Sequence, residues 1–179
     1  MTHHRRRNNG IDPSKINETV ELSPAQRYAA FKQTQAKQRT VAAEFARSMP
    51  FELDEFQMQA NDALEAGDNV LVAAPTGAGK TVAADFAIYL AQTRNVKAFY
   101  TTPIKALSNQ KYHDLVDQYG TDKVGLLTGD TSINSEADIV VMTTEVLRNM
   151  LYEHSVTLEA LRYVILDEVH YLADRFRGP

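Results

Sequence analysis

From residue 69 onward, short apolar runs alternate with segments in which apolar residues recur at helical spacing. The runs are almost continuously apolar, which is typical of strands that are covered on both faces. They are Val70–Ala73, Val96–Thr101, Val124–Leu127, Ile139–Met142 and Tyr163–Leu166. A repeated order of strand and helix requires right-handed crossover connections between the strands. This order predicts a three-layer α/β domain with a parallel sheet.

The part of the chain before residue 50 has a different character and carries no recognisable motif. Residues 1–22 are polar and aperiodic, which predicts a disordered tail. Residues 23–49 form a predicted helical segment, because Ser23 suits an N-cap and Pro24 the first helical position. The absence of glycine and proline up to Arg47 predicts one long helix there. A further helix is predicted from about Asp54 to Ala66.

Composition limits the class of protein. The chain has 179 residues, of which 44% are hydrophobic and 23% charged, as in an ordinary globular domain. It has no cysteine, so disulfides and thiolate metal sites are excluded, and we expect a cytoplasmic location. No apolar run approaches about 18 residues, so we expect no membrane span. Because the net charge is −4, any nucleic-acid binding has to use a local patch.

The segment AAPTGAGKT, residues 73–81, stands where a predicted strand gives way to a helix. Ligands of α/β domains bind at such strand ends. Glycines allow backbone amides to point at phosphate oxygens, and the following helix adds its positive dipole end. Lys80 would reach the β- and γ-phosphates, and Thr81 would offer its hydroxyl to Mg2+. The alternative is a glycine-rich turn without a ligand, which the intact Gly-Lys-Thr sequence disfavours.

We therefore predict ATP and Mg2+ as cofactors. An alanine at position 74 replaces the usual first glycine, which is tolerable if this residue need not take a positive φ. The predicted ATP-binding residues of the loop are Pro75, Thr76, Gly77, Ala78, Gly79, Lys80 and Thr81.

The segment VILDEVH, residues 164–170, is an apolar strand that ends in two carboxylates. Asp167 would hold the metal, usually through water. Glu168 would orient the attacking water and help to deprotonate it. A surface Asp-Glu pair is the alternative, which the upstream loop disfavours. The predicted catalytic residues are Glu168, Asp167 and Lys80, and the predicted metal ligands are Thr81 and Asp167.

The sequence Asp-Glu-Val-His at 167–170, together with the alanine-first loop, resembles superfamily-two helicases of the DExH-box class. It most resembles the Ski-like and Mtr-like RNA helicases and their actinobacterial HelY-type relatives. Further matching stretches are FELDEFQ at 51–57, TTPIKALSNQK at 101–111, LTGD at 127–130 and MTTEVLR at 142–148. The resemblance covers roughly residues 50–179. It implies that this range is the first RecA-like motor domain of a P-loop NTPase, truncated after the Walker B motif.

The resemblance also implies a role for two residues before the loop. Gln57 would contact the adenine edge and Phe51 would pack near the base. From spacing alone, Asp54 and Gln57 have the pattern of a capping box, which favours a structural role for Gln57.

Contacts with the sugar–phosphate backbone of single-stranded RNA are implied as well. Such contacts carry little sequence information. Some of the implied contact residues also have a structural alternative. Pro103 could be an ordinary first residue of a helix, and Thr143 or Thr144 could be an N-cap. Lys111 could be a solvated lysine. The implied nucleic-acid contacts are Pro103, Lys105, Ala106, Leu107, Gln110, Lys111, Gly129, Asp130, Thr143, Thr144 and Arg148.

The implied activity is ATP-dependent unwinding of RNA. Such motors use a Ser-Ala-Thr segment and a second RecA-like domain of the same polypeptide, and neither is in this sequence. We therefore expect weak ATP binding and slow hydrolysis by this chain alone, and an unpaired edge of its sheet. The alternatives are a DNA helicase of a neighbouring DExH branch, another P-loop ATPase, and a non-enzymatic nucleotide-dependent binding module.

Overall fold

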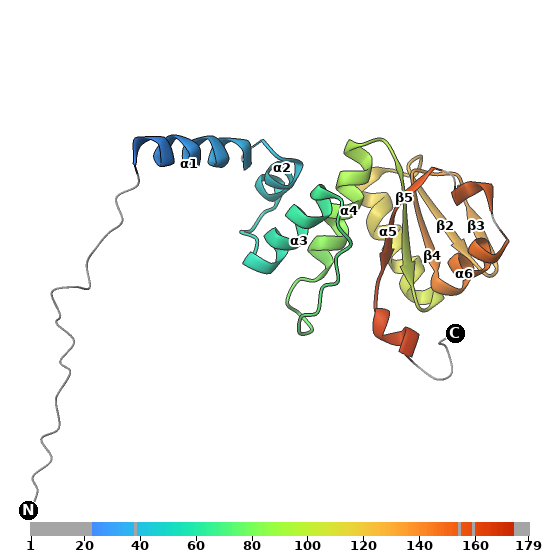
Figure 1. Ribbon diagram of the computed structural model, residues 1–179. Helices are drawn as coiled ribbons and strands as arrows, with labels where there is room; N and C mark the ends of the chain where they lie inside the picture. Colours follow the sequence, from blue (N-terminus) through green and yellow to red (C-terminus); the bar gives the residue numbers. More distant parts are fainter. Residues whose placement is uncertain (1–22, 38, 154, 159, 174–179) are drawn as a thin grey trace, which may run out of the picture. The chain divides into compact units, whose positions relative to one another are not determined.

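The computed structural model describes residues 23–37, 39–153, 155–158 and 160–173, in two units that comprise residues 1–39 and 40–179 (Figure 1). The predicted tail 1–22 lies outside the described residues. In the first unit, α1 spans Pro24–Lys37. The Ser23 backbone N–H donates to Gln26 Oε1 at 2.8 Å, and the Gln26 N–H donates to Ser23 Oγ at 3.3 Å. The predicted helix start at Ser23 and Pro24 is therefore confirmed.

The prediction of one helix up to Arg47 is wrong. A second helix, α2, spans Val41–Ser48. Thr40 is its N-cap, because its backbone is extended and its Oγ1 accepts from the Ala43 N–H at 3.1 Å. The Glu65 carboxylate accepts from the N–H groups of Val41 and Ala42 at 3.0 and 2.7 Å. A distant carboxylate thus satisfies the first amides of α2, and helix propensity alone gives no sign of this.

The second unit contains a five-stranded sheet of order β3-β2-β4-β1-β5 (Figure 1). The strands are β1 (Lys97–Thr102), β2 (Val124–Thr128), β3 (Thr131–Ile133), β4 (Ile139–Thr143) and β5 (Leu161–Leu166). All pairings are parallel except that of β3, which runs antiparallel to β2. The predicted parallel α/β architecture is therefore confirmed for four of the five predicted strands, which are β1, β2, β4 and β5. The short hairpin strand β3 makes the sheet mixed.

The first predicted strand, Val70–Ala73, is not a strand in the structure. Residues 68–75 have no regular secondary structure, and Leu71 is 79% exposed. A strand exists only where a neighbour completes its ladder, and no described strand pairs with this segment. The strand β5 lies at one edge of the described sheet, and its residues Val164 and Leu166 are exposed. The described sheet has its two edges at β3 and β5. That a missing Ser-Ala-Thr strand would pair at one of these edges stays a prediction.

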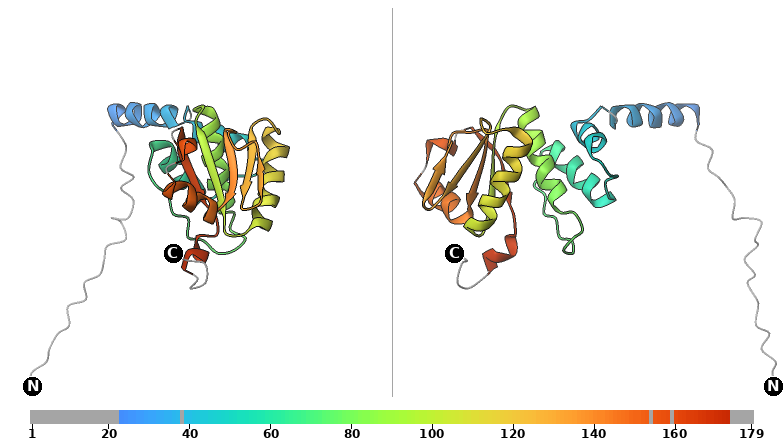
Figure 2. Two further views of the ribbon diagram at one scale, coloured as in Figure 1. Left: turned by 90° about the vertical axis from the view of Figure 1, so that its right-hand side faces the viewer. Right: turned by 180° about the vertical axis from the view of Figure 1, so that it is seen from behind.

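Helices cover both faces of the sheet, as Figures 1 and 2 show. On one face, Ile88 of α4 (Thr81–Thr93) and Leu115 of α5 (Lys105–Tyr119) pack with Tyr100 of β1. On the other face, Leu147 of α6 (Thr144–Tyr152) packs with Phe99. Neighbouring residues of β1 therefore serve opposite layers, as the pleat requires.

A third apolar cluster joins α2 and α4, with α3 (Glu55–Ala66) packed against both. The rings of Phe45 and Phe86 lie 5.2 Å apart within it. Short 3-10 helices span Val156–Leu158 and Val169–Ala173.

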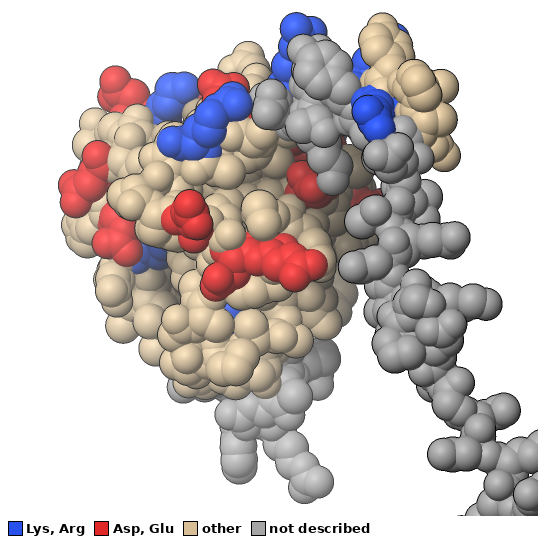
Figure 3. All heavy atoms as spheres, turned by 90° about the vertical axis from the view of Figure 1, so that its left-hand side faces the viewer, with Lys and Arg blue, Asp and Glu red and all other residues tan. Residues whose placement is uncertain are grey.

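In the described ranges, no helix has the length and apolar character needed to cross a bilayer. Acidic side chains lie across the middle of the face seen in Figure 3, which disfavours nucleic-acid binding there.

We expect a Glu65→Ala substitution to lower the free energy of unfolding by roughly 1–3 kcal/mol, because two helix amides lose a charged acceptor. Urea unfolding of the chain measures this change. Asp62→Ala, which removes an exposed carboxylate from the same helix, is the control and should change stability by less than about 0.5 kcal/mol. Equal effects of the two substitutions would contradict the assigned role of Glu65.

Candidate nucleotide and nucleic-acid site

The phosphate loop is folded around its own lysine. Lys80 Nζ donates to the carbonyl oxygens of Ala74 and Pro75 at 2.8 and 3.2 Å. Gly77 and Gly79 have φ values of +83° and +75°, the left-handed region that favours glycine. Among the described residues other than glycine, positive φ occurs at Asn95, Asn134 and Glu168, so Ala74 fits without strain. The loop ends where α4 begins, at Thr81.

Gln57 connects the start of α3 to this loop. Its Oε1 accepts from the Asp54 N–H at 2.9 Å, and its Nε2 donates to the Gly79 carbonyl at 3.0 Å. The side chain is only 4% exposed, whereas Phe51 is exposed. The capping box predicted from spacing is confirmed. The adenine contacts of Gln57 and Phe51 stay predictions.

The two carboxylates follow β5, as predicted. Asp167 Oδ1 accepts from the Glu168 N–H at 2.8 Å, and Oδ2 accepts from the Tyr100 hydroxyl at 2.7 Å. Glu168 has a φ of +52°, a strained backbone of the kind that clusters at functional sites. Its Oε2 lies 3.1 Å from His170 Nδ1. Glu168 thus lies on a turn, and its carboxylate has a different partner, His170, from those of Asp167.

The site has the chemistry that Mg2+ prefers. Thr81 and Asp167 offer a hydroxyl and a carboxylate, and both residues are exposed. In the part of the chain that the structure describes, no three His, Asp or Glu side chains are grouped to enclose a metal. Mg2+ usually keeps several waters and takes one or two protein oxygens plus phosphate oxygens, which fits this sparse set. Figures 1 and 2 show the phosphate loop and the end of β5 at the same edge of the unit.

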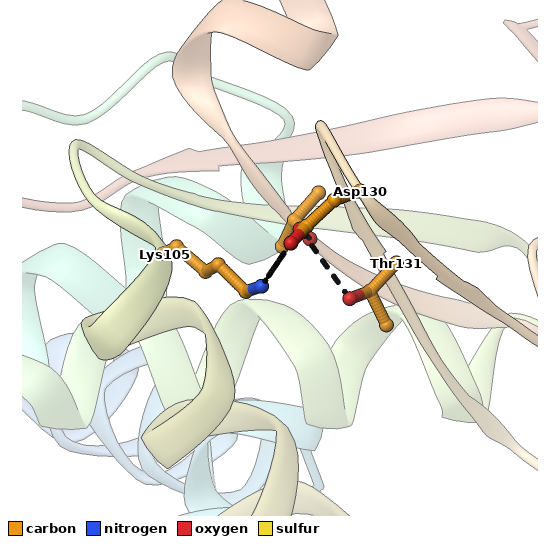
Figure 4. A network of polar contacts seen from close by, with 4 residues as sticks. Lys105, Asp130 and Thr131 are labelled. Carbon is orange, nitrogen blue, oxygen red and sulfur yellow. Dashed lines mark hydrogen bonds and ion pairs between the residues drawn. The ribbon is translucent and has the colours of Figure 1, made fainter.

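Two of the motifs predicted to contact a nucleic-acid strand, here called strand-contact motifs, are joined by an ion pair. Lys105 Nζ, at the start of α5, lies 2.7 and 2.6 Å from the two oxygens of Asp130, which follows β2 (Figure 4). The hydroxyls of Thr128 and Thr131 donate to Asp130 Oδ1 at 3.1 and 3.4 Å. The hydrogen bond from Lys105, with that from Thr128, holds the pKa of the Asp130 carboxyl below its usual range. In this structure, therefore, Lys105 is paired with a carboxylate and not directed freely to solvent.

The third predicted motif lies where β4 passes into α6. Thr143 occupies the N-cap position of α6 with an extended backbone, as the N-cap alternative predicts, but its side chain makes no capping hydrogen bond. The Thr144 hydroxyl donates to the Thr102 carbonyl at 3.2 Å, which ties α6 to the end of β1. Arg148 is exposed one turn further along α6. Thr144 thus has a structural contact, and its contact with phosphate stays a prediction.

Exposure separates the remaining predicted strand-contact residues. Ala106, Gln110 and Gly129 are exposed, whereas Pro103 and Leu107 are partly buried. Lys111 is turned inward. Its side chain is 15% exposed, and its Nζ lies 3.0 Å from Asp85 Oδ1 and 4.9 Å from the centre of the Tyr100 ring. This geometry favours an internal role for Lys111, because its charge already has a partner. The solvated lysine considered as the alternative does not occur, and the contact of Lys111 with nucleic acid stays a prediction.

Tyr100 is the site residue that sequence analysis missed, because it lies within an apolar run and carries no motif of its own. The sequence does carry one indication of its role. A tyrosine within a buried apolar run has a hydroxyl that usually needs a hydrogen-bond partner. Burial raises the pKa of the Tyr100 hydroxyl far above its ordinary value, and the neighbouring Asp167 raises it further. Tyr100 is therefore a neutral donor at any physiological pH.

A family model described as DEAD/DEAH box helicase matches residues 54–179. The chain is 62% identical over 135 residues to "Probable helicase HelY" of Mycobacterium tuberculosis, which covers 75% of the chain but 15% of that protein. It is 48% identical over 133 residues to "ATP-dependent RNA helicase mtr4" of Schizosaccharomyces pombe, covering 74% and 12%. A solved structure of the DUF1998 helicase MrfA bound to DNA and AMPPNP matches with a TM-score of 0.59 and 28% identity, covering 74% of this chain and 21% of that one.

We expect a Lys105→Met substitution to raise the pKa of the Asp130 carboxyl toward its ordinary value, because its main hydrogen-bond donor is removed. A pH titration of the carboxyl 13C signals by NMR measures this. Since the folded pKa of Asp130 is depressed, the ion pair contributes stability above the ordinary carboxyl pKa and loses it as the pH falls through the depressed value. The Glu136 carboxyl, whose pKa is lowered by Lys97, is the internal control and should not change. An unchanged Asp130 titration would contradict the pairing.

We expect Gly79→Ala to destabilise the chain more than Gly77→Ala does, by about 1 kcal/mol in urea unfolding. Both substitutions put a side chain at positive φ, but only at Gly79 would the new Cβ lie 2.6 Å from Gln57 Nε2. In a Gln57→Ala background the excess should disappear. If the excess persists there, Gln57 is not what supports the loop.

Proposed function

The chain belongs to the DEAD/DEAH box helicase family, and we propose that it is the ATP-binding domain of a motor that couples ATP hydrolysis to the binding and unwinding of RNA. The observation that carries this proposal is the arrangement at one edge of the sheet. The carboxyl ends of parallel strands meet at the same edge, where α/β domains bind ligands. The carboxylates follow β5, and the predicted strand-contact residues follow β1, β2 and β4.

On this proposal, ATP binding is an exchange of partners at Lys80. The ammonium group leaves the carbonyls of Ala74 and Pro75 and takes phosphate oxygens instead. The amides of the loop and the start of α4 provide further positive potential for the phosphates. Thr81 and Asp167 would hold Mg2+, which neutralises charge on the transferred phosphoryl group. Glu168 would orient the attacking water and accept its proton.

RNA is proposed as the strand that this motor grips. The support is the 48% identity to a protein described as an ATP-dependent RNA helicase, together with the strand-contact motifs around Lys105, Asp130 and Thr144. Contacts of this type reach phosphate and sugar, so they would not select a base sequence. DNA is the second candidate, because the MrfA structure to which this chain is similar holds DNA.

The chain spans 15% of the HelY protein it matches, so the activity of a whole motor goes beyond this sequence. We propose that a second RecA-like domain of the same polypeptide completes the site. An arginine finger, where motors of this kind have one, is worth on the order of 10³–10⁵ in rate. On that proposal, we expect the chain alone to bind nucleotide weakly and to hydrolyse it slowly.

The test is ATP turnover by the polypeptide as its organism makes it, without nucleic acid, with single-stranded RNA and with single-stranded DNA. We expect stimulation by RNA, and an approximately 10²-fold or greater loss in Glu168→Gln, since this substitution removes the proton acceptor. Lys80→Ala should lose ATP binding itself. Equal or greater stimulation by DNA would move the proposal to a DNA helicase, and indifference to both would leave a P-loop ATPase without a nucleic-acid role.

A further inference from the structure

The buried Tyr100 is bonded to the carboxylate that the proposed function assigns to the metal. Tyr100 lies in the middle of β1, is 2% exposed, and packs among Ile88, Leu115 and Val141. Its hydroxyl donates to Asp167 Oδ2 at 2.7 Å. A tyrosine on a buried strand has few rotamers open to it, so its hydroxyl is a donor at a fixed point.

The strand register explains why these residues meet. In the parallel pairing of β1 with β5, Tyr100 lies beside Ile165, and Asp167 is two residues further along on the same face. The Asp167 N–H donates to the Thr101 carbonyl at 3.0 Å, so the ladder holds the backbone of Asp167 as well. Glu168 donates its N–H to Asp167 Oδ1. Each carboxylate oxygen thus has one donor from the chain and a lone pair left for a metal-bound water or a cation.

The tyrosine ring is in turn held by a charged pair. Lys111 Nζ lies 4.9 Å from the ring centre, a cation–π distance, and forms an ion pair with Asp85 at 3.0 Å. Asp85 stands one turn after Thr81 on α4, so the network connects the helix that follows the phosphate loop to the carboxylate on β5. Lys111 belongs to α5, which also carries Lys105 at its start.

We propose that Tyr100 is a positioning residue for Asp167: its hydroxyl fixes the direction of the carboxylate, so that Mg2+–nucleotide meets an oxygen that is already aimed. The proposal rests on the proposed role of Asp167 at the metal. It explains why Tyr100 carries a hydroxyl among buried cluster members that are otherwise purely aliphatic. Hydrogen-bond partners of metal-binding groups typically change metal affinity by 10–100-fold when they are removed.

The experiment measures the affinity of the polypeptide, as its organism makes it, for a fluorescent ATP analogue, with excess Mg2+ and with a chelator in its place. Tyr100→Phe removes only the hydroxyl and leaves the ring in the core. We expect it to lower the Mg2+-dependent gain in affinity about tenfold and to leave the affinity without Mg2+ unchanged. Tyr119→Phe is the matched control, because it removes a hydroxyl from a tyrosine packed against the same apolar cluster. It should leave both affinities unchanged.

Asp167→Asn separates the inference from the proposed function. If Asp167→Asn abolishes the Mg2+-dependent gain and Tyr100→Phe retains it, the proposed metal role stands and the inference is wrong. If Asp167→Asn also retains the gain, the metal role of Asp167 fails and the inference fails with it. If Tyr100→Phe weakens binding equally with and without Mg2+ and lowers the melting temperature, Tyr100 is merely structural. That outcome also overturns the proposal.

Discussion

The parallel pairing of β1 with both β4 and β5 is the constraint on which the rest of the structure depends. Because parallel strands end at the same edge, it gathers Thr102, Thr143 and Asp167 from segments far apart in the sequence. The register also sets which side chains can meet. It puts Tyr100 and Asp167 on one face and turns Phe99 to the other, so a single strand supports both the apolar core and the site.

The polar groups of the site hold one another in this structure. Lys80 is bound by loop carbonyls, Lys105 by Asp130, Gln57 by Gly79 and Asp167 by Tyr100. On the proposed function, nucleotide binding at Lys80 and strand binding at Lys105 would therefore be exchanges, in which a new contact replaces an existing one. Only the difference between the two contributes to affinity, as for any hydrogen bond exchanged in water. The helix α5 carries both Lys105, paired with Asp130, and Lys111, paired with Asp85.

The sequence predicted what depends on local pattern. Continuous apolar runs predicted β1, β2, β4 and β5, and the Ser23 and Asp54 signals located the starts of α1 and α3. It failed where a partner distant in sequence decides. The run Val70–Ala73 has the composition of a strand but no described strand to pair with, and the start of α2 depends on Glu65. Similarly, a lysine on a helix is usually solvated, whereas Lys111 forms an ion pair with Asp85 and lies over the Tyr100 ring.

The central claim is that one edge of this sheet couples nucleotide to RNA. The most direct measurement is the dissociation constant for single-stranded RNA with and without a saturating, non-hydrolysable ATP analogue and Mg2+, made on the polypeptide as its organism produces it. The account predicts that the nucleotide changes RNA affinity, and that RNA changes nucleotide affinity by the same factor, because coupling is reciprocal. An RNA affinity that is the same with and without nucleotide would contradict it.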